Sequence, residues 1–135
     1  MEQLFVDTSG WLALLNRADA LHAMATKIYG ERFAAGWDVV THDGILLEVG
    51  NGFSSVRLRR HAVSWKERLA TSAHVTVVSL SAELHESGWQ LYTARPDKDW
   101  SSVDCISFVL MHEYGLTEAL TADHHFEQVG FIKLL

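Results

Sequence analysis

Apolar side chains show two kinds of spacing, which alternate along the chain. Short, almost continuous apolar runs are typical of strands buried on both faces. Such runs lie at residues 4–6, 37–41, 75–78, 119–121 and 131–134. Between them, apolar residues recur every three or four positions, which is the spacing of a helix with one buried face. These segments lie at residues 11–15, 21–33, 45–53, 54–72, 80–94 and 101–115.

Local signals mark two boundaries of the expected elements. Asp19 is placed to cap the helix over residues 21–33. The segment 95–99 contains the only proline and separates the last two expected helices. Strands that alternate with helices predict an α/β fold, in which a central parallel sheet is covered by helices on both faces.

Size and composition suit one domain with a well-packed core. The chain has 135 residues, of which 48% are hydrophobic, and chains of about 100 to 200 residues usually fold around one core. We therefore expect a single domain over residues 1–135. Cys105 is the only cysteine, which rules out a disulfide framework and suits a reducing compartment. Because neither a signal peptide nor a membrane span of roughly 18 apolar residues is visible, we expect a cytoplasmic protein.

The charge of the chain is negative overall but uneven. The formal net charge is −6, which is not typical of a protein that holds nucleic acid through its overall field. One segment is strongly basic, with Arg57, Arg59, Arg60, Lys66 and Arg68 within twelve residues. Such a cluster is either a solvated helix face or a flank that binds a phosphate backbone.

Acidic residues fall where the expected strands end. Asp7 follows the first strand, Asp123 follows the strand at 119–121, and Asp104 lies in the first turn of a helix that begins near Ser101. In an open parallel sheet, chemistry gathers outside the carboxyl ends of the strands, where loops and helix N-termini meet. We therefore expect these three carboxylates to lie near one another.

Glu48 is the fourth acid of this set. It lies between Ile45 and Val49 on the apolar face of its helix, where an unpaired carboxylate costs several kcal/mol. Each acid has a structural alternative. Asp7 and Asp123 could be helix N-caps, Asp104 could belong to a capping box, and Glu48 could form a buried ion pair with an arginine.

A set of four carboxylates points to Mg²⁺ or Mn²⁺, because hard oxygen ligands without cysteine favour these ions over zinc. A zinc site at His124 and His125 would need further His or Cys at tetrahedral spacing, and the other histidines show no such pattern. Gly-rich phosphate loops and a Gly-x-Ser-x-Gly elbow are also missing from the sequence.

The motifs around these acids resemble the PIN domain, in particular the VapC-type toxin ribonucleases of bacterial toxin-antitoxin pairs. The resemblance covers the whole chain in the right order and rests on residues 4–9 (LFVDTS), 48–51 (EVGN), 100–105 (WSSVDC) and 120–126 (LTADHHF). It implies a three-layer sandwich with a central parallel sheet in the order 3-2-1-4-5. It also implies a Mg²⁺- or Mn²⁺-dependent endoribonuclease that forms homodimers and is inhibited by a small antitoxin protein.

Site residues are carried over by matching position. The resemblance implies that Asp7, Glu48, Asp104 and Asp123 form the acidic metal site. It further implies that Thr8 or Ser9, Asn51 and Ser101 are polar residues that orient carboxylates or waters. Members of the family often have a basic residue after the fourth acid, where this chain has His124.

The expected substrate is single-stranded or looped RNA, because proteins that read RNA mostly bind splayed-out regions. Arg57, Arg59 and Arg60 are candidates for contacts with its backbone. Two alternatives stay open at this point. The first is a catalytically idle protein that acts through its partner, and the second is a DNA nuclease or phosphatase that uses the same metal site.

Overall fold

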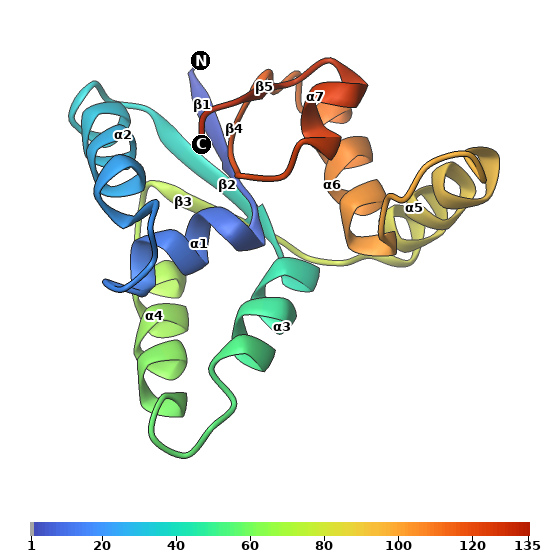
Figure 1. The fold of residues 1–135 in the computed structure, drawn as a ribbon. Helices are drawn as coiled ribbons and strands as arrows, with labels where there is room; N and C mark the ends of the chain where they lie inside the picture. Colours follow the sequence, from blue (N-terminus) through green and yellow to red (C-terminus); the bar gives the residue numbers. More distant parts are fainter. Residues whose placement is uncertain (1) are drawn as a thin grey trace.

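Five parallel strands form the centre of the molecule. The computed structural model describes residues 2–135, and its sheet has the order β3-β2-β1-β4-β5, which confirms the predicted topology (Figure 1). The strands are β1 Gln3–Val6, β2 Asp38–His42, β3 Val75–Val78, β4 Glu118–Leu120 and β5 Ile132–Lys133. In the register of the sheet, Phe5 of the central strand β1 lies opposite Val40 on one side and Ala119 on the other.

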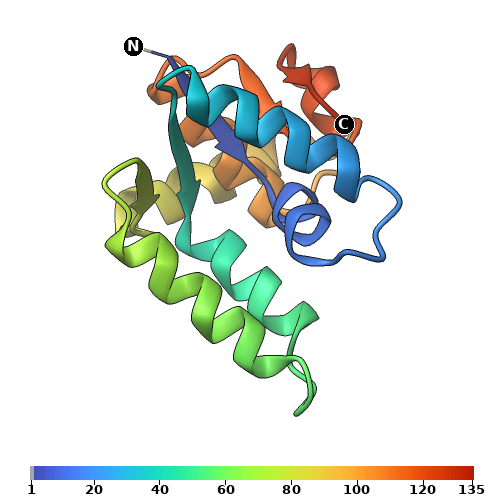
Figure 2. The ribbon, with the colours of Figure 1, turned by 90° about the vertical axis from the view of Figure 1, so that its left-hand side faces the viewer.

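Helices cover both faces of this sheet, as the sequence predicts. They are α1 Thr8–Leu15, α2 His22–Ala34, α3 Asp43–Gly52, α4 Arg59–Thr71, α5 Ala82–Ala94, α6 Ser102–Glu113 and α7 His125–Val129. Figure 1 shows α1, α2 and α4 on one side of the strands and α5, α6 and α7 on the other. Figure 2 shows α3 and α4 side by side, extending beyond the carboxyl end of β2. The result is a three-layer α/β arrangement.

The core forms on both faces of β1. Leu4, Phe5 and Val6 are fully buried, which explains the continuous apolar run at this strand. On one face the ring of Phe126 packs between those of Phe5 and Phe108, with centroid distances of 6.1 Å to Phe5 and 4.9 Å to Phe108. These contacts attach α6 and the short α7 firmly to the sheet, next to the strand ends that carry the acids.

Three local expectations are wrong. The helix expected from residue 54 begins at Arg59, because the chain first turns back through Ser55, whose carbonyl accepts from the N–H groups of Leu58 and Arg59. Asp19 caps no helix. Its carboxylate accepts from the N–H of Leu21 in the turn before α2. Helix α7 was not expected, since five residues are too few to show helical spacing.

Among residues 2–135, no helix is both long enough and apolar enough to cross a lipid bilayer. The helices of this structure are half-buried elements that pack on the sheet or on one another.

Candidate active site

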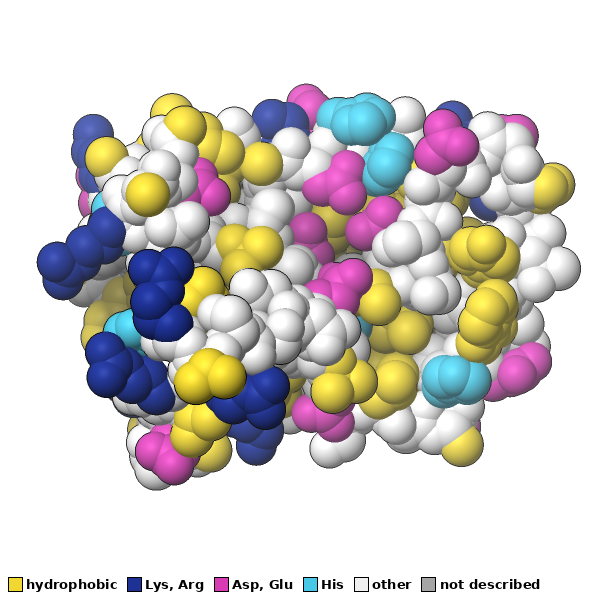
Figure 3. All heavy atoms as spheres, turned by 60° about the horizontal axis from the view of Figure 1, so that its bottom comes forward, with side chains coloured by type: hydrophobic (Ala, Val, Ile, Leu, Met, Phe, Trp, Pro, Cys, Tyr) yellow, Lys and Arg dark blue, Asp and Glu magenta, His cyan; other side chains and the backbone are white. Residues whose placement is uncertain are grey.

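Four separate elements bring the predicted acids to one face of the molecule. Asp7 links β1 to α1, Glu48 lies on α3, Asp104 lies in the first turn of α6, and Asp123 follows β4. All four positions are at the carboxyl ends of the strands or on helices that begin there. Figure 3 looks onto this face and shows a group of acidic side chains near its middle, with histidines beside it.

Asp7 is the most deeply buried of the four carboxylates, with 5% of its surface exposed. Its Oδ2 accepts a hydrogen bond of 3.1 Å from the hydroxyl of Thr121. Burial, together with the negative charges of Asp104 and Glu48, raises the pKa of Asp7 from 3.8 to about 7. Asp7 precedes α1, but its side chain makes no capping hydrogen bond to this helix. The helix-cap interpretation of Asp7 is therefore wrong.

Asp104 is both a helix cap and a member of the acidic group. Its Oδ2 accepts from the backbone N–H of Ser101 at 3.1 Å, while the Ser101 hydroxyl accepts from the N–H of Asp104 at 3.0 Å. This capping box confirms the structural alternative for Asp104. Burial, followed by the charge of Asp123, raises the pKa of Asp104. The cap therefore fixes the carboxylate where it faces the other acids.

Asp123 and Glu48 complete the group from opposite sides. Asp123 closes a turn, because its Oδ1 accepts from the N–H of His125 at 2.9 Å. The half-buried Glu48 accepts a hydrogen bond from the hydroxyl of Thr8. Among residues 2–135, no lysine or arginine forms an ion pair with Glu48, so the expected alternative of a buried arginine pair is wrong.

The supporting polar residues differ in what they contact. Thr8 reaches Glu48, and Ser101 reaches Asp104, as described above. The hydroxyl of Ser9 lies 3.1 Å from that of Thr121 and accepts from the N–H of Ala122 at 3.0 Å. Asn51 is exposed near the end of α3, and within the described residues it has no side-chain hydrogen bond to the acids.

Thr121 is a site residue that the sequence reasoning missed. Its fully buried hydroxyl donates to Asp7 and accepts from the backbone N–H of Asp123 at 3.0 Å. One side chain therefore holds two of the four acids at a fixed relative position. The available signal was a threonine at the end of a strand, two residues before an acid, which is too common a pattern to stand out.

His125 also lies at the site, although from the sequence it was considered only as part of a zinc site and set aside. Its Nδ1 lies 3.1 Å from Oδ1 of Asp123 and 3.4 Å from Oδ2 of Asp104. Among residues 2–135, Asp123, His124 and His125 are the one group of three potential ligands whose donor atoms all lie within 4.8 Å of one another. The four carboxylates are thus neighbours around a wider space, with His125 between two of them.

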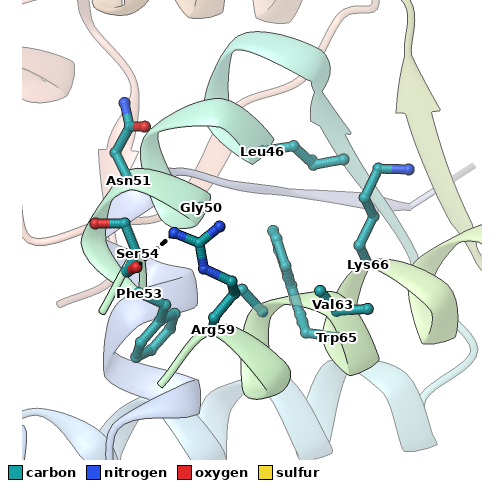
Figure 4. Close-up of a pocket in the computed structure, with 10 residues that line it drawn as sticks. Leu46, Gly50, Asn51, Phe53, Ser54, Arg59, Val63, Trp65 and Lys66 are labelled. Carbon is teal, nitrogen blue, oxygen red and sulfur yellow. Dashed lines mark hydrogen bonds between the residues drawn. The ribbon is translucent and has the colours of Figure 1, made fainter. Parts of the chain in front are cut away.

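Basic residues lie to one side of the acidic group. Arg57, Arg59 and Arg60 are all exposed, and Figure 3 shows lysine and arginine side chains gathered at one end of the face that carries the acids. Arg59 donates to the carbonyl oxygen of Ser54 at 2.8 Å. Figure 4 shows it at the edge of a hollow of about 350 Å³ between α3 and α4, together with Asn51.

Residues 4–132 match the PIN domain, so the chain belongs to the PIN domain family. The resemblance noted from the sequence motifs is confirmed.

Individual relatives extend over nearly the whole chain. The "23S rRNA-specific endonuclease VapC20" of Mycobacterium tuberculosis, recorded in the strains CDC 1551 and H37Rv, is 30% identical over 131 residues, which are 97% of each protein. A similar solved structure is that of M. tuberculosis VapC20, described as a "Sarcin-Ricin loop cleaving toxin". Its TM-score is 0.85 at 29% identity, with 96% of this chain and 97% of that chain covered.

More distant structures share the fold alone. VapBC2 from Rickettsia felis, solved bound to a DNA fragment from its promoter, aligns with a TM-score of 0.71 at 11% identity and covers 97% of this chain and 96% of that one. FitAcB from Neisseria gonorrhoeae aligns with a TM-score of 0.67 at 12% identity, over 96% and 95% of the two chains.

Proposed function

We propose that this protein is a divalent-metal-dependent endoribonuclease that cleaves looped RNA and acts as the toxin of a toxin-antitoxin pair. One observation carries the proposal. Asp7, Glu48, Asp104 and Asp123 come from four separate elements to one face, and residues 2–135 supply no lysine or arginine that forms an ion pair with any of them. A site that gathers uncompensated negative charge in this way is suited to a cation.

The donor set fits Mg²⁺ or Mn²⁺. The acids offer carboxylate oxygens, which both ions prefer. Burial and the charges of Asp104 and Glu48 raise the pKa of Asp7, and a cation beside these carboxylates would offset both effects. The Nδ1 atom of His125 is buried beside these acids and makes no hydrogen bond, so it too is available to an ion.

In this proposal, Asp7 and Asp104 bind the cation directly, and Glu48 and Asp123 bind it or hold its waters. When bound, the cation would activate a water for attack on phosphorus and stabilise charge on the leaving oxygen. The protein itself supplies orientation. Thr121 fixes Asp7, Thr8 fixes Glu48, and Ser101 fixes Asp104. Because these hydrogen bonds come from the protein itself, the carboxylates need little rearrangement to bind a cation.

A loop of ribosomal RNA is the substrate class that we propose. The support is the relative that is 30% identical over 97% of the chain and is named as a 23S rRNA-specific endonuclease. Single-stranded or looped RNA also suits an open face, where a splayed nucleotide can reach buried acids. Asn51 and the exposed Arg57, Arg59 and Arg60 would then hold the backbone on the side of α3 and α4.

The proposed toxin function also implies protein partners. A toxin that cleaves ribosomal RNA needs an inhibitor in its own cell, and we propose a small cognate antitoxin protein. We also propose a homodimer in the cytoplasm, where a reducing environment suits the buried Cys105.

The function is tested by cleavage assays with the purified protein. An RNA hairpin, a DNA hairpin of the same sequence and a small phosphoester are incubated in EDTA and in millimolar Mg²⁺ or Mn²⁺. We expect only the RNA to be cut, and only with a metal. Cleavage of DNA or the phosphoester would favour the alternative enzymes, and no cleavage of any substrate would favour an idle protein that acts through its partner.

A matched pair of variants tests the site within the same assay. Glu48→Gln keeps the shape of the side chain and the hydrogen bond to Thr8, but it removes a charge. We expect cleavage to fall by about 100-fold or more while the melting temperature changes little. Glu67→Gln, an exposed site on α4, should behave as wild type. If Glu48→Gln cleaves RNA normally, the four-carboxylate site is wrong.

A further inference from the structure

The imidazole of His125 occupies a position that hydrogen bonding does not explain. Its Nδ1 is shielded from solvent and lies 3.1 Å from Oδ1 of Asp123 and 3.4 Å from Oδ2 of Asp104, yet it satisfies hydrogen-bond geometry with neither. A buried polar atom without a partner is uncommon, because it loses its water without a replacement. The atom is therefore placed for a partner other than these two oxygens.

The backbone around His125 is held in place on several sides. The N–H of His125 donates to Asp123 at 2.9 Å. The next residue, Phe126, is fully buried against Phe5 and Phe108. At the other end of α7, Gln128 accepts a hydrogen bond of 2.8 Å from the indole of Trp100. These contacts fix α7, and with it the direction from which the ring enters the site.

The separations around Nδ1 match those between ligands of one ion. Two adjacent ligands that are each about 2.1 Å from an octahedral ion lie roughly 3 Å apart. The distance of 3.1 Å from Nδ1 to Oδ1 of Asp123 is close to this value. Oδ2 of Asp104 is 3.4 Å from Nδ1, but Asp104 lies outside the group whose donor atoms are all within 4.8 Å of one another. Hydrogen bonds would require a different alignment of the ring, whereas ligands of a shared ion need only point toward a common centre.

We propose that Nδ1 of His125 is a direct ligand of the divalent cation, next to Asp104 and Asp123, and that it makes the site favour Mn²⁺ over Mg²⁺. The inference rests on the metal dependence proposed above and adds a nitrogen ligand to the oxygen set. Mg²⁺ strongly prefers oxygen ligands, whereas imidazole nitrogen is a better ligand for transition metals. A site of carboxylates alone has less reason to distinguish the two ions.

Pulsed electron paramagnetic resonance of the Mn²⁺-loaded protein tests this proposal directly. A histidine nitrogen bound to Mn²⁺ produces modulation from ¹⁴N in the spectrum, and carboxylate ligands do not. We expect this modulation in wild type, its loss in His125→Asn, and its retention in His112→Asn. His112 is the control, because it is an exposed histidine in the last turn of α6 and lies outside the candidate ligand group. Wild-type Mn²⁺ spectra without ¹⁴N modulation would overturn the proposal.

Binding affinities give a second readout that is independent of RNA cleavage. Titration of free Mn²⁺, with Mg²⁺ as competitor, should show that His125→Asn weakens Mn²⁺ binding by about tenfold or more. Mg²⁺ binding should weaken less, so that the preference for Mn²⁺ shrinks. Equal losses for both ions would mean that His125 only orients the carboxylates, which contradicts direct binding.

Two further comparisons separate a failure of the proposed role of His125 from a failure to fold or to bind metal. If His125→Asn does not fold, wild type labelled with ¹⁵N-histidine must replace the ¹⁴N modulation by that of ¹⁵N, and His112→Asn must keep the signal. If the protein binds Mn²⁺ and cleaves RNA without nitrogen modulation, only the role of His125 is wrong. If it binds neither ion, the proposed metal-dependent function fails as well.

Discussion

At the scale of single residues, Asp7 is the acid whose charge is hardest to keep in the folded protein. Its pKa is raised to about 7 from the 3.8 of an ordinary aspartate, mainly by burial. Between about pH 4 and pH 7 the unfolded chain has therefore lost this proton while the folded protein still holds it. In this range the stability of the metal-free protein falls as the pH rises, and the loss is complete above about pH 7.

Thermal melts in EDTA test this consequence. From about pH 5 to pH 8, we expect the melting temperature of wild type to fall and that of Asp7→Asn to fall less. At the upper end Asp7→Asn should melt higher than wild type. The melting temperature of Asp7→Asn should still fall somewhat with pH, because the pKa of Asp104 is also raised.

The control for this experiment is Asp97→Asn, since Asp97 is a surface carboxylate paired with Arg95 and its pKa is lowered to about 2. It should keep the wild-type slope. If the melting temperatures of wild type and Asp7→Asn change with pH in the same way, the pKa of Asp7 is not raised in the folded protein.

At the scale of elements, the turn before α4 determines which of the basic residues lie outside this helix. Because residues 54–58 form turns instead of helix, Arg57 lies outside α4 while Arg59 and Arg60 begin it. This brings three exposed cations to the connection between α3 and α4 and the start of α4. Figure 3 shows lysine and arginine side chains gathered at one end of the face that carries the acids. A phosphate backbone that crosses the acidic site can continue over this end.

Replacement of Arg57, Arg59 and Arg60 together by glutamine tests that path. If each contacts one phosphate of single-stranded RNA, the slope of log affinity against log salt should become shallower by about 2. The measurement is the affinity for RNA at several salt concentrations, with Ca²⁺ in place of Mg²⁺ or Mn²⁺ so that the RNA is not cut. Arg95→Gln, which changes a cation on the loop between α5 and α6, is the control. An unchanged slope in the triple variant would assign these arginines to solvent or to a protein partner.

The contact between α1 and β4 is equally close to the site and leaves no space for a side chain at Gly10. A Cβ there would lie 2.1 Å from the backbone oxygen of Leu120, so α1 would have to move away from the strand that leads to Thr121. We expect Gly10→Ala to destabilise the protein by about 1 to 3 kcal/mol.

Gly30→Ala is the matched control for Gly10→Ala. Gly30 lies inside α2, and a Cβ there meets nothing within 4 Å. Alanine should therefore stabilise that helix by about 0.5 to 1 kcal/mol. Denaturant unfolding of both variants provides the comparison, and a Gly10→Ala protein as stable as wild type would show that α1 can shift freely.

At the scale of the whole molecule, the net charge of −6 hides two regions of opposite sign on one face. The acidic group lies near the middle of this face and the basic side chains lie at its end (Figure 3). An RNA backbone is attracted to one and repelled by the other unless a cation occupies the acidic site. The negative total therefore says little about whether this face binds RNA.

Much of this architecture is a property of the sequence itself. The alternation of apolar runs with helical spacing identified five strands and six of the seven helices, because burial on one or two faces imposes a period that is visible locally. The site acids were recognisable for a related reason. Asp7 and Asp123 end strands, Asp104 starts a helix, and Glu48 is a charge on an apolar face.

Only the tertiary structure decided how these residues meet. The hydrogen bonds of Thr121 to Asp7 and of Thr8 to Glu48 join positions 114 and 40 residues apart, and His125 reaches Asp104 from a helix too short to show a pattern. Spacing along a chain reports which face a residue occupies, but not which distant residue lies opposite it. That choice depends on the packing of complete strands and helices, which is why the four acids of the candidate site could be selected from the sequence and the groups that hold them in place could not.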